Sequence, residues 1–279
     1  MAPSTSTRRR VARTSAVRLS AAGRREATER LIGEEPLEIR VAGPDGVVGA
    51  TTATMRTPGH DFELAAGLLR AEGVIAGPGD LAEIRYCTDV DVQQYNVVTV
   101  HLRRPPRREL AARSLMATAS CGVCGTASID ELCDRVPVVG GTTSIDAAVL
   151  AGLPDLLREE QSLFAETGGN HGAGVFRADG SPLVVREDVG RHNALDKALG
   201  ARLLAGTDPG EDDVVVLSGR VSFELVQKTA AAGVPILVAV SAPSSLAVET
   251  AQRLGVTLAA FVREGRATLY AHPERVVGR

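Results

Sequence analysis

The sequence lacks any apolar run close to the ~20 residues that a helix needs to cross a bilayer. Residues 1–30 also lack the apolar stretch of a secretory signal, since Arg13 and Arg18 interrupt the segment 11–22. We therefore expect a cytoplasmic protein with no membrane association.

A large excess of charge of one sign is also missing, because 31 basic and 34 acidic side chains give a net charge of −3. Eight arginines against two glutamates in residues 1–30 leave the remainder distinctly acidic. A basic nucleic-acid surface is therefore not expected. We predict that the Arg-rich segment 1–30 is a solvated, disordered tail.

Cysteine is scarce, with four in 279 residues: Cys87, Cys121, Cys124 and Cys133. Stable disulfides are rare in a reducing compartment, so reactivity or metal binding is the question to ask of these residues. Cys121 and Cys124 stand in Ser-Cys-Gly-Val-Cys-Gly, where glycine lets the backbone turn tightly and leaves the sulfur atoms accessible. Cys87 and Cys133 lie in or beside apolar segments, so we predict that both are small, buried hydrophobic side chains rather than reactive thiols.

Three kinds of site compete for the pair of Cys121 and Cys124. A zinc knuckle needs two further ligands, and the sequence has no second Cys-x-x-Cys. A thioredoxin-like pair should follow the first strand of a βαβ unit, but residues 110–118 are poorly strand-like. An accessible nucleophilic thiol needs only a lowered thiol pKa and a partner, and nothing here conflicts with it. We expect no bound metal.

The periodicity of apolar residues predicts two domains joined near the connector 103–108. Residues 31–113 should form a small α+β domain with a hairpin of residues 37–41 and 47–55, a helix over 61–72 and a strand over 96–102. Residues 114–279 should form an α/β domain with the Cys-x-x-Cys loop at its start. Strand-helix alternation there implies a largely parallel sheet covered by helices.

The elements expected in this second domain follow in order. Apolar positions from 153 to 164 mark a helix that ends before Gly168. The remaining predictions are a hairpin of residues 173–176 and 182–186, a helix around 194–199, strands at 214–217, 236–240 and 256–262, helices at 223–232 and 245–254, and a last hairpin at residues 264–265.

Two polar segments could carry chemistry. In the Gly-rich loop 167–174 the amides could cradle an anion and His171 could assist proton movement; the alternative is a helix C-cap with turn glycines. In the segment 186–193, Asp188 or Asn193 could serve as a helix N-cap, but Arg191 and His192 exceed what capping requires.

Two predicted strands end in polar turns that open helices, at Ser218-Gly219-Arg220 and at Ser244-Ser245. Helix N-termini attract phosphate, and ligands of open α/β sheets bind beyond the carboxyl ends of the strands. Arg220, Arg263 and Arg266 would add charge-assisted contacts. A phosphorylated ligand is therefore predicted, against the alternative of routine caps and surface arginines.

Five motifs together resemble the FdhD family of formate dehydrogenase accessory sulfurtransferases, in the family's order and from about Glu35 to the C-terminus. They are Ser-Cys-Gly-Val-Cys-Gly, Thr-Gly-Gly-Asn-His-Gly-Ala, Arg-Glu-Asp-Val-Gly-Arg-His-Asn-Ala-Leu-Asp-Lys, Ser-Gly-Arg-Val-Ser-Phe-Glu and Phe-Val-Arg-Glu-Gly-Arg. The resemblance implies a cytidine-deaminase-like three-layer α/β domain preceded by a smaller α+β domain, and a homodimer.

The resemblance also implies an activity. A sulfur carrier of this family accepts sulfur from a cysteine desulfurase and delivers it to the molybdenum cofactor, bis-molybdopterin guanine dinucleotide, before that cofactor enters formate dehydrogenase. The persulfide position corresponds to Cys121, and Cys124 could relay sulfur, form a transient disulfide or tune the pKa of Cys121. The cofactor-binding segment corresponds to Phe261, Val262, Arg263, Glu264, Gly265 and Arg266.

Two other functions compete with this one. A zinc deaminase needs His-x-Glu upstream of Pro-Cys-x-x-Cys, whereas Ser120 precedes Cys121 and the only His-x-Glu begins at His272. A non-catalytic chaperone that only binds the molybdenum cofactor would use the same phosphate-binding features. Persulfide on the purified protein would separate a carrier from a chaperone.

Overall fold

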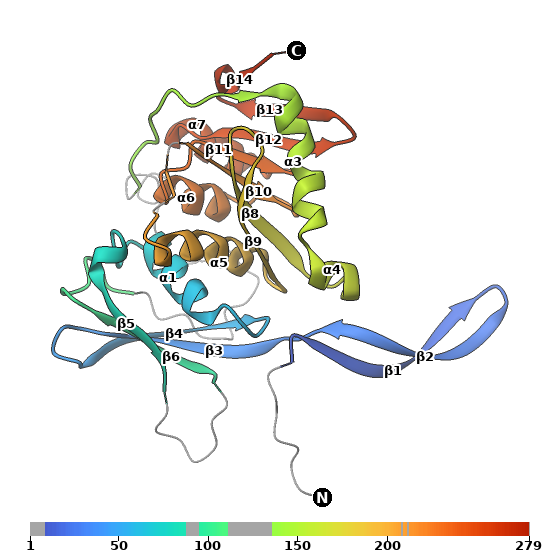
Figure 1. Cartoon of the computed structure of the whole chain (residues 1–279), viewed down its shortest axis with the longest axis horizontal. Coiled ribbons are helices and arrows are strands. Elements are labelled where there is room, and N and C mark those ends of the chain that lie inside the picture. The colour runs from blue at the N-terminus through green and yellow to red at the C-terminus, as the bar shows by residue number, and fades with distance from the viewer. Residues whose placement is uncertain (1–8, 88–94, 111–135, 208, 211, 279) are drawn as a thin grey trace, which may run out of the picture.

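The computed structural model describes residues 9–87, 95–110, 136–207, 209–210 and 212–278. They form a mixed α/β protein with a six-stranded and a four-stranded sheet, and a two-stranded hairpin that projects from one side (Figure 1). Cys121, Cys124, Cys133 and the expected domain boundary at residues 113–114 lie outside these ranges. None of the helices within them has the length and apolar composition of a membrane span.

The smaller sheet has the strand order β4-β3-β6-β5, and helix α1 packs against it. The elements are β3 (Glu35–Ala42), β4 (Val48–Arg56), α1 (Asp61–Ala71), the short helix η1 (Pro78–Asp80), β5 (Leu81–Tyr86) and β6 (Val97–Leu102). The predicted hairpin, helix and last strand are confirmed. Strand β5 was not predicted, since it lies at the sheet edge and buries only Leu81 fully.

The larger sheet has the order β13-β12-β11-β10-β8-β9. Its strands are β8 (His171–Arg177), β9 (Pro182–Asp188), β10 (Asp213–Leu217), β11 (Ile236–Ala239), β12 (Thr257–Arg263) and β13 (Arg266–Ala271). The predicted strands are confirmed, but the expectation of a largely parallel sheet is wrong. Only β10–β11 and β11–β12 are parallel pairs, because β8–β9 and β12–β13 are hairpins and β8 runs antiparallel to β10.

Helices cover both faces of this sheet (Figure 1). Val215 and Leu217 of β10 pack in one core with α5 (Arg191–Leu204), α6 (Phe223–Ala231) and α7 (Ser245–Leu254). Val214 and Val216 point the other way, into a second core with α3 (Ala147–Glu159). Alternation along a strand thus gives three layers. The short strand β7 (Ile145–Asp146) directly precedes α3 and pairs in parallel with β14 (Val276–Val277), near the end of the chain. Strand β14 follows the short helix η3 (Pro273–Arg275).

The single helix expected over residues 153–164 is two helices, α3 and α4 (Ser162–Thr167). The buried Glu187 carboxylate accepts hydrogen bonds from the amides of Leu163 (2.9 Å) and Phe164 (2.8 Å), which fixes where α4 begins. The predicted end before Gly168 is confirmed, because Gly168 caps α4 in the left-handed conformation.

The two sheets are joined by the crossing of α1 and α5. A Cβ on Gly67 would lie 1.9 Å from the Asp196 carbonyl oxygen, and a Cβ on Gly200 would lie 1.9 Å from the Glu63 carbonyl oxygen. Only glycine permits this separation. Leu203 of α5 also lies in the core of the smaller sheet, so the two parts share buried surface.

The prediction that residues 1–30 form a disordered tail is wrong for residues 11–30. Residues 11–32 form an antiparallel hairpin of β1 (Val11–Ser20) and β2 (Gly23–Ile32), with Val11 opposite Ile32 and Ser20 opposite Gly23. The ladder pairs the inward-facing backbone groups of the two strands, which a solvated tail would leave to water. At its base, Ile32 packs beside Gly169.

Candidate functional site

A pocket of about 620 Å³ lies at the carboxyl ends of β10, β11 and β12, where β8 begins. This is the sheet edge at which the sequence predicted a ligand. The pocket is closed on its other side by α3, α4 and the turn that follows α4. Its lining residues are Pro154, Asp155, Leu157, Arg158, Gln161, Phe164, Gly168, Gly169, Asn170, His171, Ser218, Val240, Val262 and Arg263.

His171 and Ser218 are brought together by the pairing of β8 with β10. The Ser218 hydroxyl accepts a hydrogen bond from the Gly172 amide (2.8 Å), and the Ser218 amide donates to the Gly172 carbonyl (3.0 Å). The ring of His171 lies against Gly219, where a Cβ would stand 3.1 Å from Nδ1. A larger residue at position 219 would therefore have to push the imidazole ring away by a few tenths of an ångström.

Burial lowers the pKa of His171, and the neighbouring positive charge of Arg191 lowers it further. His171 is therefore a neutral imidazole at neutral pH, which can both donate and accept a hydrogen bond. Arg220 also lowers this pKa, but its side chain is exposed and does not line the pocket.

The segment from Phe261 to Arg266 is divided between the pocket and the surface. Val262 and Arg263 line the pocket. Glu264 and Gly265 form the two-residue turn of the hairpin, both with positive φ. Arg266 is exposed and forms an ion pair with Glu264, and Phe261 is also exposed. Of the two arginines predicted to bind phosphate in this segment, only Arg263 reaches the pocket.

Sequence reasoning missed the contribution of α3 and α4. Arg158 stacks over the ring of Phe164, with its guanidinium carbon 3.9 Å from the ring centroid. Gln161 and Asn170 are buried, and each has one side-chain polar atom without a hydrogen-bond partner in the described structure. Of these residues only Asn170 carried a signal, since it stands in the Gly-rich motif.

The segment 186–193 serves to join the two parts of the protein. Neither Asp188 nor Asn193 is the N-cap of α5, which is Gly190. The buried Asp188 carboxylate accepts hydrogen bonds from the amides of Thr57 and Gly190 and lies 2.6 Å from Lys197 Nζ. Asn193 donates to the Met55 carbonyl at 2.6 Å.

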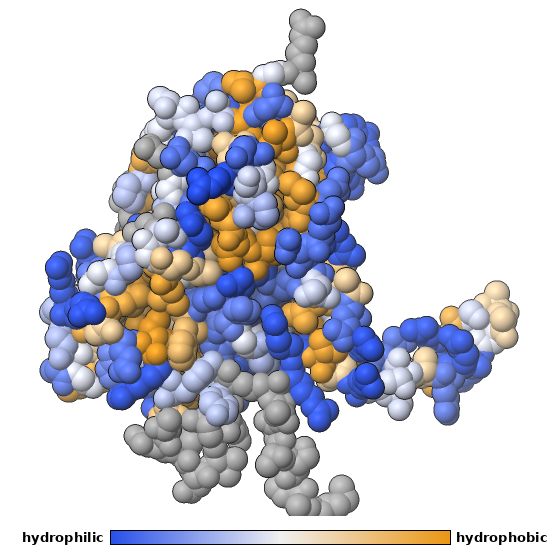
Figure 2. Space-filling model, in the orientation of Figure 1, coloured by the Kyte–Doolittle hydropathy of each residue, from blue (hydrophilic) through white to orange (hydrophobic). Residues whose placement is uncertain are grey.

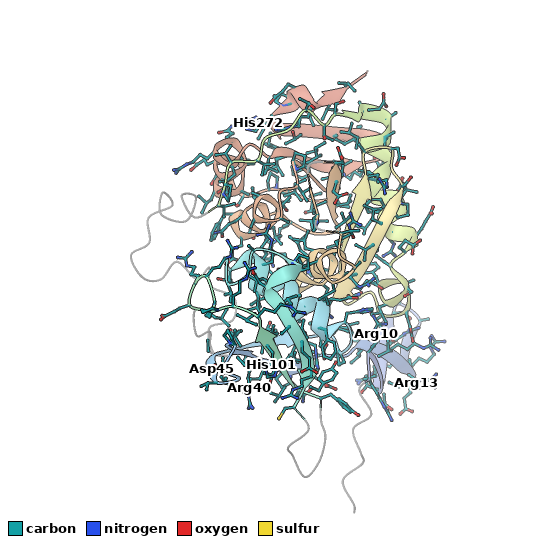
Figure 3. All side chains as sticks on the ribbon, turned by 60° about the vertical axis from the view of Figure 1, so that its left-hand side comes forward. Arg10, Arg13, Arg40, Asp45, His101 and His272 are labelled. Carbon is teal, nitrogen blue, oxygen red and sulfur yellow. The ribbon has the colours of Figure 1, made fainter. Side chains whose placement is uncertain are left out.

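The other predicted residues lie apart from the pocket. Ser244 is a routine N-cap that accepts from the Ala247 amide at 3.2 Å. His192 Nε2 lies 3.1 Å from the Ser222 hydroxyl and 2.8 Å from a Glu224 oxygen. His272, which begins the only His-x-Glu of the sequence, lies at the opposite end of the molecule from His101 of β6 (Figure 3).

The predicted persulfide site, Cys121, and its neighbour Cys124 are not among the described residues, so their roles stay predictions. The described His, Cys, Asp and Glu side chains form no group of three that could hold a metal ion.

Comparison with known proteins identifies the chain. The model of the FdhD/NarQ family matches residues 32–277. Proteins named sulfur carrier protein FdhD include one from Nocardia farcinica, 46% identical over 95% of this chain and 94% of its own. Another, from Mycolicibacterium paratuberculosis, is 49% identical over 89% of this chain and 92% of its own. A third, from Thermoplasma acidophilum, is 41% identical over 92% of this chain and 90% of its own.

A solved structure gives the same result. The crystal structure of a candidate formate dehydrogenase accessory protein from Desulfotalea psychrophila superimposes with a TM-score of 0.73 and 27% identity. The match covers 96% of this chain and 99% of that one. The chain therefore belongs to the FdhD/NarQ family.

Proposed function

We propose that this chain is a sulfur carrier for formate dehydrogenase. It takes up sulfur as a persulfide on Cys121 and passes that sulfur to the molybdenum cofactor, bis-molybdopterin guanine dinucleotide, before the cofactor enters the enzyme. The names of its relatives support the carrier role and the link to formate dehydrogenase. The family resemblance supports a cysteine desulfurase as the donor and a cytidine-deaminase-like arrangement of the α/β domain, and the lack of long apolar runs supports a cytoplasmic location.

The uptake of sulfur follows the chemistry of thiol-disulfide exchange. The Cys121 thiolate attacks the terminal sulfur of the donor's persulfide, a new sulfur-sulfur bond forms at Cys121, and the donor cysteine leaves as a thiolate. From the glycines beside Cys121 in the sequence, we expect the thiol to be accessible for this displacement. Cys124 stands three residues further on and would assist as a relay.

The observation that carries the cofactor part of the proposal is the meeting of Arg263, His171 and Ser218 in one pocket. Arg158 adds a second guanidinium group, against the single carboxylate of Asp155. Guanidinium groups, a hydroxyl and a neutral imidazole suit the phosphates of a nucleotide. We propose that this pocket receives a guanine nucleotide arm of the cofactor, which is the substrate rather than a resident group.

Persulfide loading tests the carrier role. Incubation with a cysteine desulfurase and cysteine should add sulfur to the wild type, which mass spectrometry detects as a mass increase on the Cys121 peptide. Cys124→Ala should load partially. If Cys121→Ala loads as well as the wild type, the carrier assignment is wrong, and a chaperone that only binds the cofactor becomes the better description.

Calorimetric titration with GDP tests the pocket. Affinity should be on the order of micromolar or weaker, because GDP fills only part of a site for a larger cofactor. Arg263→Ala and Arg158→Ala should each weaken binding several-fold, whereas the matched variant Arg266→Ala, which removes an exposed arginine from the same hairpin, should not. Equal binding by Arg263→Ala and the wild type would place the nucleotide elsewhere, and equal affinity for ADP would make the pocket a generic phosphate site.

Elemental analysis tests the prediction that no metal is bound. A zinc ion held tightly at about one per chain, and lost in Cys121→Ala, would convert the cysteine pair into a metal site and exclude the carrier function.

A further inference from the structure

The hairpin of residues 11–32, which we call the arm, leaves the body of the protein almost at once (Figure 1). Ten paired positions at about 3.3 Å per residue give it a reach of roughly 30 Å. Its contacts with the body lie at its base, where Ile32 packs beside Gly169 and Arg30 Nη1 lies 3.2 Å from Glu166 Oε1. A two-stranded hairpin on its own is marginally stable in water, so the arm needs a partner surface.

The side chains of the arm indicate the charge of that surface. Arg13 stands directly opposite Arg30, and Arg18 directly opposite Arg25. Like charges at opposite positions of a strand pair are destabilising. Glu29 relieves Arg18 through a bidentate contact that includes a 3.0 Å hydrogen bond. Five arginines against two glutamates make the arm basic. Arg13 lies near its base, and Arg10 adds a further positive charge just before the arm (Figure 3).

The arm also exposes apolar side chains. Val17 is 50% exposed, Leu19 74% and Leu31 49%. Figure 2 shows a hydrophilic arm with apolar surface at its tip. Basic side chains around a few exposed apolar ones resemble an interface rim and its centre. The fitting partner is therefore an acidic protein surface.

The body of this chain offers such a surface. Residues 33–279 carry 23 basic and 32 acidic side chains, a net charge of −9, after the eight arginines and two glutamates before them are set aside. Helix α4 contacts β2 near the base of the arm, and α3 leads into it. The exposed carboxylates of this region are Asp155 and Glu159 of α3, Glu160 at its C-cap and Glu166 of α4. Glu166 already binds Arg30 of its own arm, which shows that this surface and the arm are compatible.

We propose that the arm clasps a second copy of this chain, with its arginines paired to the α3–α4 carboxylates of that copy. A two-fold dimer presents the same patches twice, so an arm and an acidic surface that adjoin each other on one copy can meet their counterparts on the other. The reach of the arm exceeds the roughly 20 Å length of α3.

The clasp would also complete the candidate site. Asp155 and Arg158 of α3 line the pocket, so an arm lying along α3 brings arginines of one copy to the pocket mouth of the other. This consequence rests on the proposed function, because it adds positive charge where a nucleotide phosphate would bind. The clasp itself does not depend on it.

A charge swap tests the clasp, with sedimentation velocity as the measurement of mass. The wild type should be a dimer that weakens as salt is added. The arm variant Arg24→Glu, Arg25→Glu and the surface variant Glu159→Arg, Glu160→Arg should each weaken the dimer at least about tenfold. Combining the two sets in one chain should restore the dimer to within a few-fold of the wild type.

The matched control Arg104→Glu, Arg108→Glu reverses two exposed charges of the connector after β6 and should leave the dimer unchanged. A wild type that stays monomeric at tens of micromolar, an arm variant that dimerises like the wild type, or a swap that fails to restore the dimer would each overturn the proposal. Circular dichroism should show that every variant folds. Persulfide loading of Cys121 in the same variants keeps failure of the clasp distinct from failure of the carrier function.

Discussion

At the scale of single residues, the junction between the two parts depends on buried charges. Lys197 lies 2.6 Å from an Asp188 oxygen and donates to the Thr57 carbonyl at 2.8 Å, with almost no exposed surface on either charged side chain. Asp188 also holds the Thr57 amide. One ion pair therefore connects β9 and α5 of the larger part with the end of β4 in the smaller part.

We predict that Lys197→Met destabilises the protein by about 3–5 kcal/mol, because it leaves the Asp188 carboxylate buried without its cation. The free energy of unfolding in urea measures this. Arg18→Met, which removes the cation of an exposed ion pair on the arm, should change that free energy little. Equal losses for the two variants would mean that the Lys197 pair contributes no more than a surface pair.

Glu63 gives the junction a dependence on pH. Burial alone would raise the pKa of its carboxyl, but hydrogen bonds from Arg186 and His60 outweigh this and lower the pKa to about 2. In the unfolded chain, a glutamate carboxyl has a pKa of about 4.3. The contacts of the Glu63 carboxylate with Arg186 and His60 therefore stabilise the fold above about pH 4.3. This contribution to the free energy of unfolding is lost as the pH falls toward 2 and the carboxylate becomes protonated.

We predict that the urea midpoint of the wild type falls more steeply between pH 5 and pH 3 than that of Glu63→Gln, which cannot ionise. Over this pH range the wild type should lose about 1 kcal/mol more of its free energy of unfolding than Glu63→Gln does. The loss is no larger because the Glu63 carboxylate is partly exposed to solvent. Parallel pH profiles for the two proteins would show that Glu63 is not held in this way.

Some site residues could be predicted from the sequence and others could not. Ser218 and Arg263 follow from the rule that ligands bind at the carboxyl ends of parallel strands. Arg158 and Gln161 could not be found this way, because Arg158 lies near the end of an ordinary amphipathic helix and Gln161 is the N-cap of the next one, and both reach the pocket only through tertiary packing. Arg266 was predicted at the site but does not line the pocket. It stands directly opposite Arg263 in the hairpin, and its exposed guanidinium group pairs with Glu264, a local contact that the sequence did not reveal.

At the scale of elements, strong apolar periodicity located most strands and helices of both sheets, but not the edge strand β5. The arm escaped prediction because its arginines hide the alternation of Val11, Val17 and Leu19. The break between α3 and α4 depends on Glu187, which is distant in sequence. The direction of the strands was predicted poorly, because a strand pattern does not show whether its neighbour is reached by a hairpin or by a helix.

The crossing of α1 and α5 gives a prediction about Gly67. We expect Gly67→Ala to destabilise the protein by at least about 1–3 kcal/mol, because the new methyl group would overlap the Asp196 carbonyl and force the helices apart. Gly152→Ala is the matched control. Gly152 also lies inside a helix, α3, but has open space around it, so alanine there should stabilise by about 0.5–1 kcal/mol. Urea unfolding of both variants decides whether the helix crossing requires glycine.

At the scale of the whole molecule, the sequence predicted two domains, and the structure shows how closely the described parts are packed. Leu203 of the larger part lies in the core of the smaller sheet, and Arg186 of β9 donates to Glu63 of α1 with its Nη2 2.8 Å from Oε1. Contacts between segments more than 100 residues apart leave no periodic signal in a sequence. The arrangement of the two sheets could therefore not be predicted.

We predict that the two parts unfold in a single transition, because separating them would expose the Lys197 pair, the α1–α5 crossing and Leu203 together. Tyrosine signals report mainly on the smaller part, since Tyr86 and Tyr95 stack there with ring centroids 5.2 Å apart, Tyr270 is the third tyrosine, and the chain has no tryptophan. Far-ultraviolet circular dichroism reports mainly on the helices of the larger part. The two urea transitions should coincide in midpoint and steepness, and in Gly67→Ala both should move to lower urea together. A tyrosine transition that precedes the loss of helix would show instead that the smaller part is an independent folding unit.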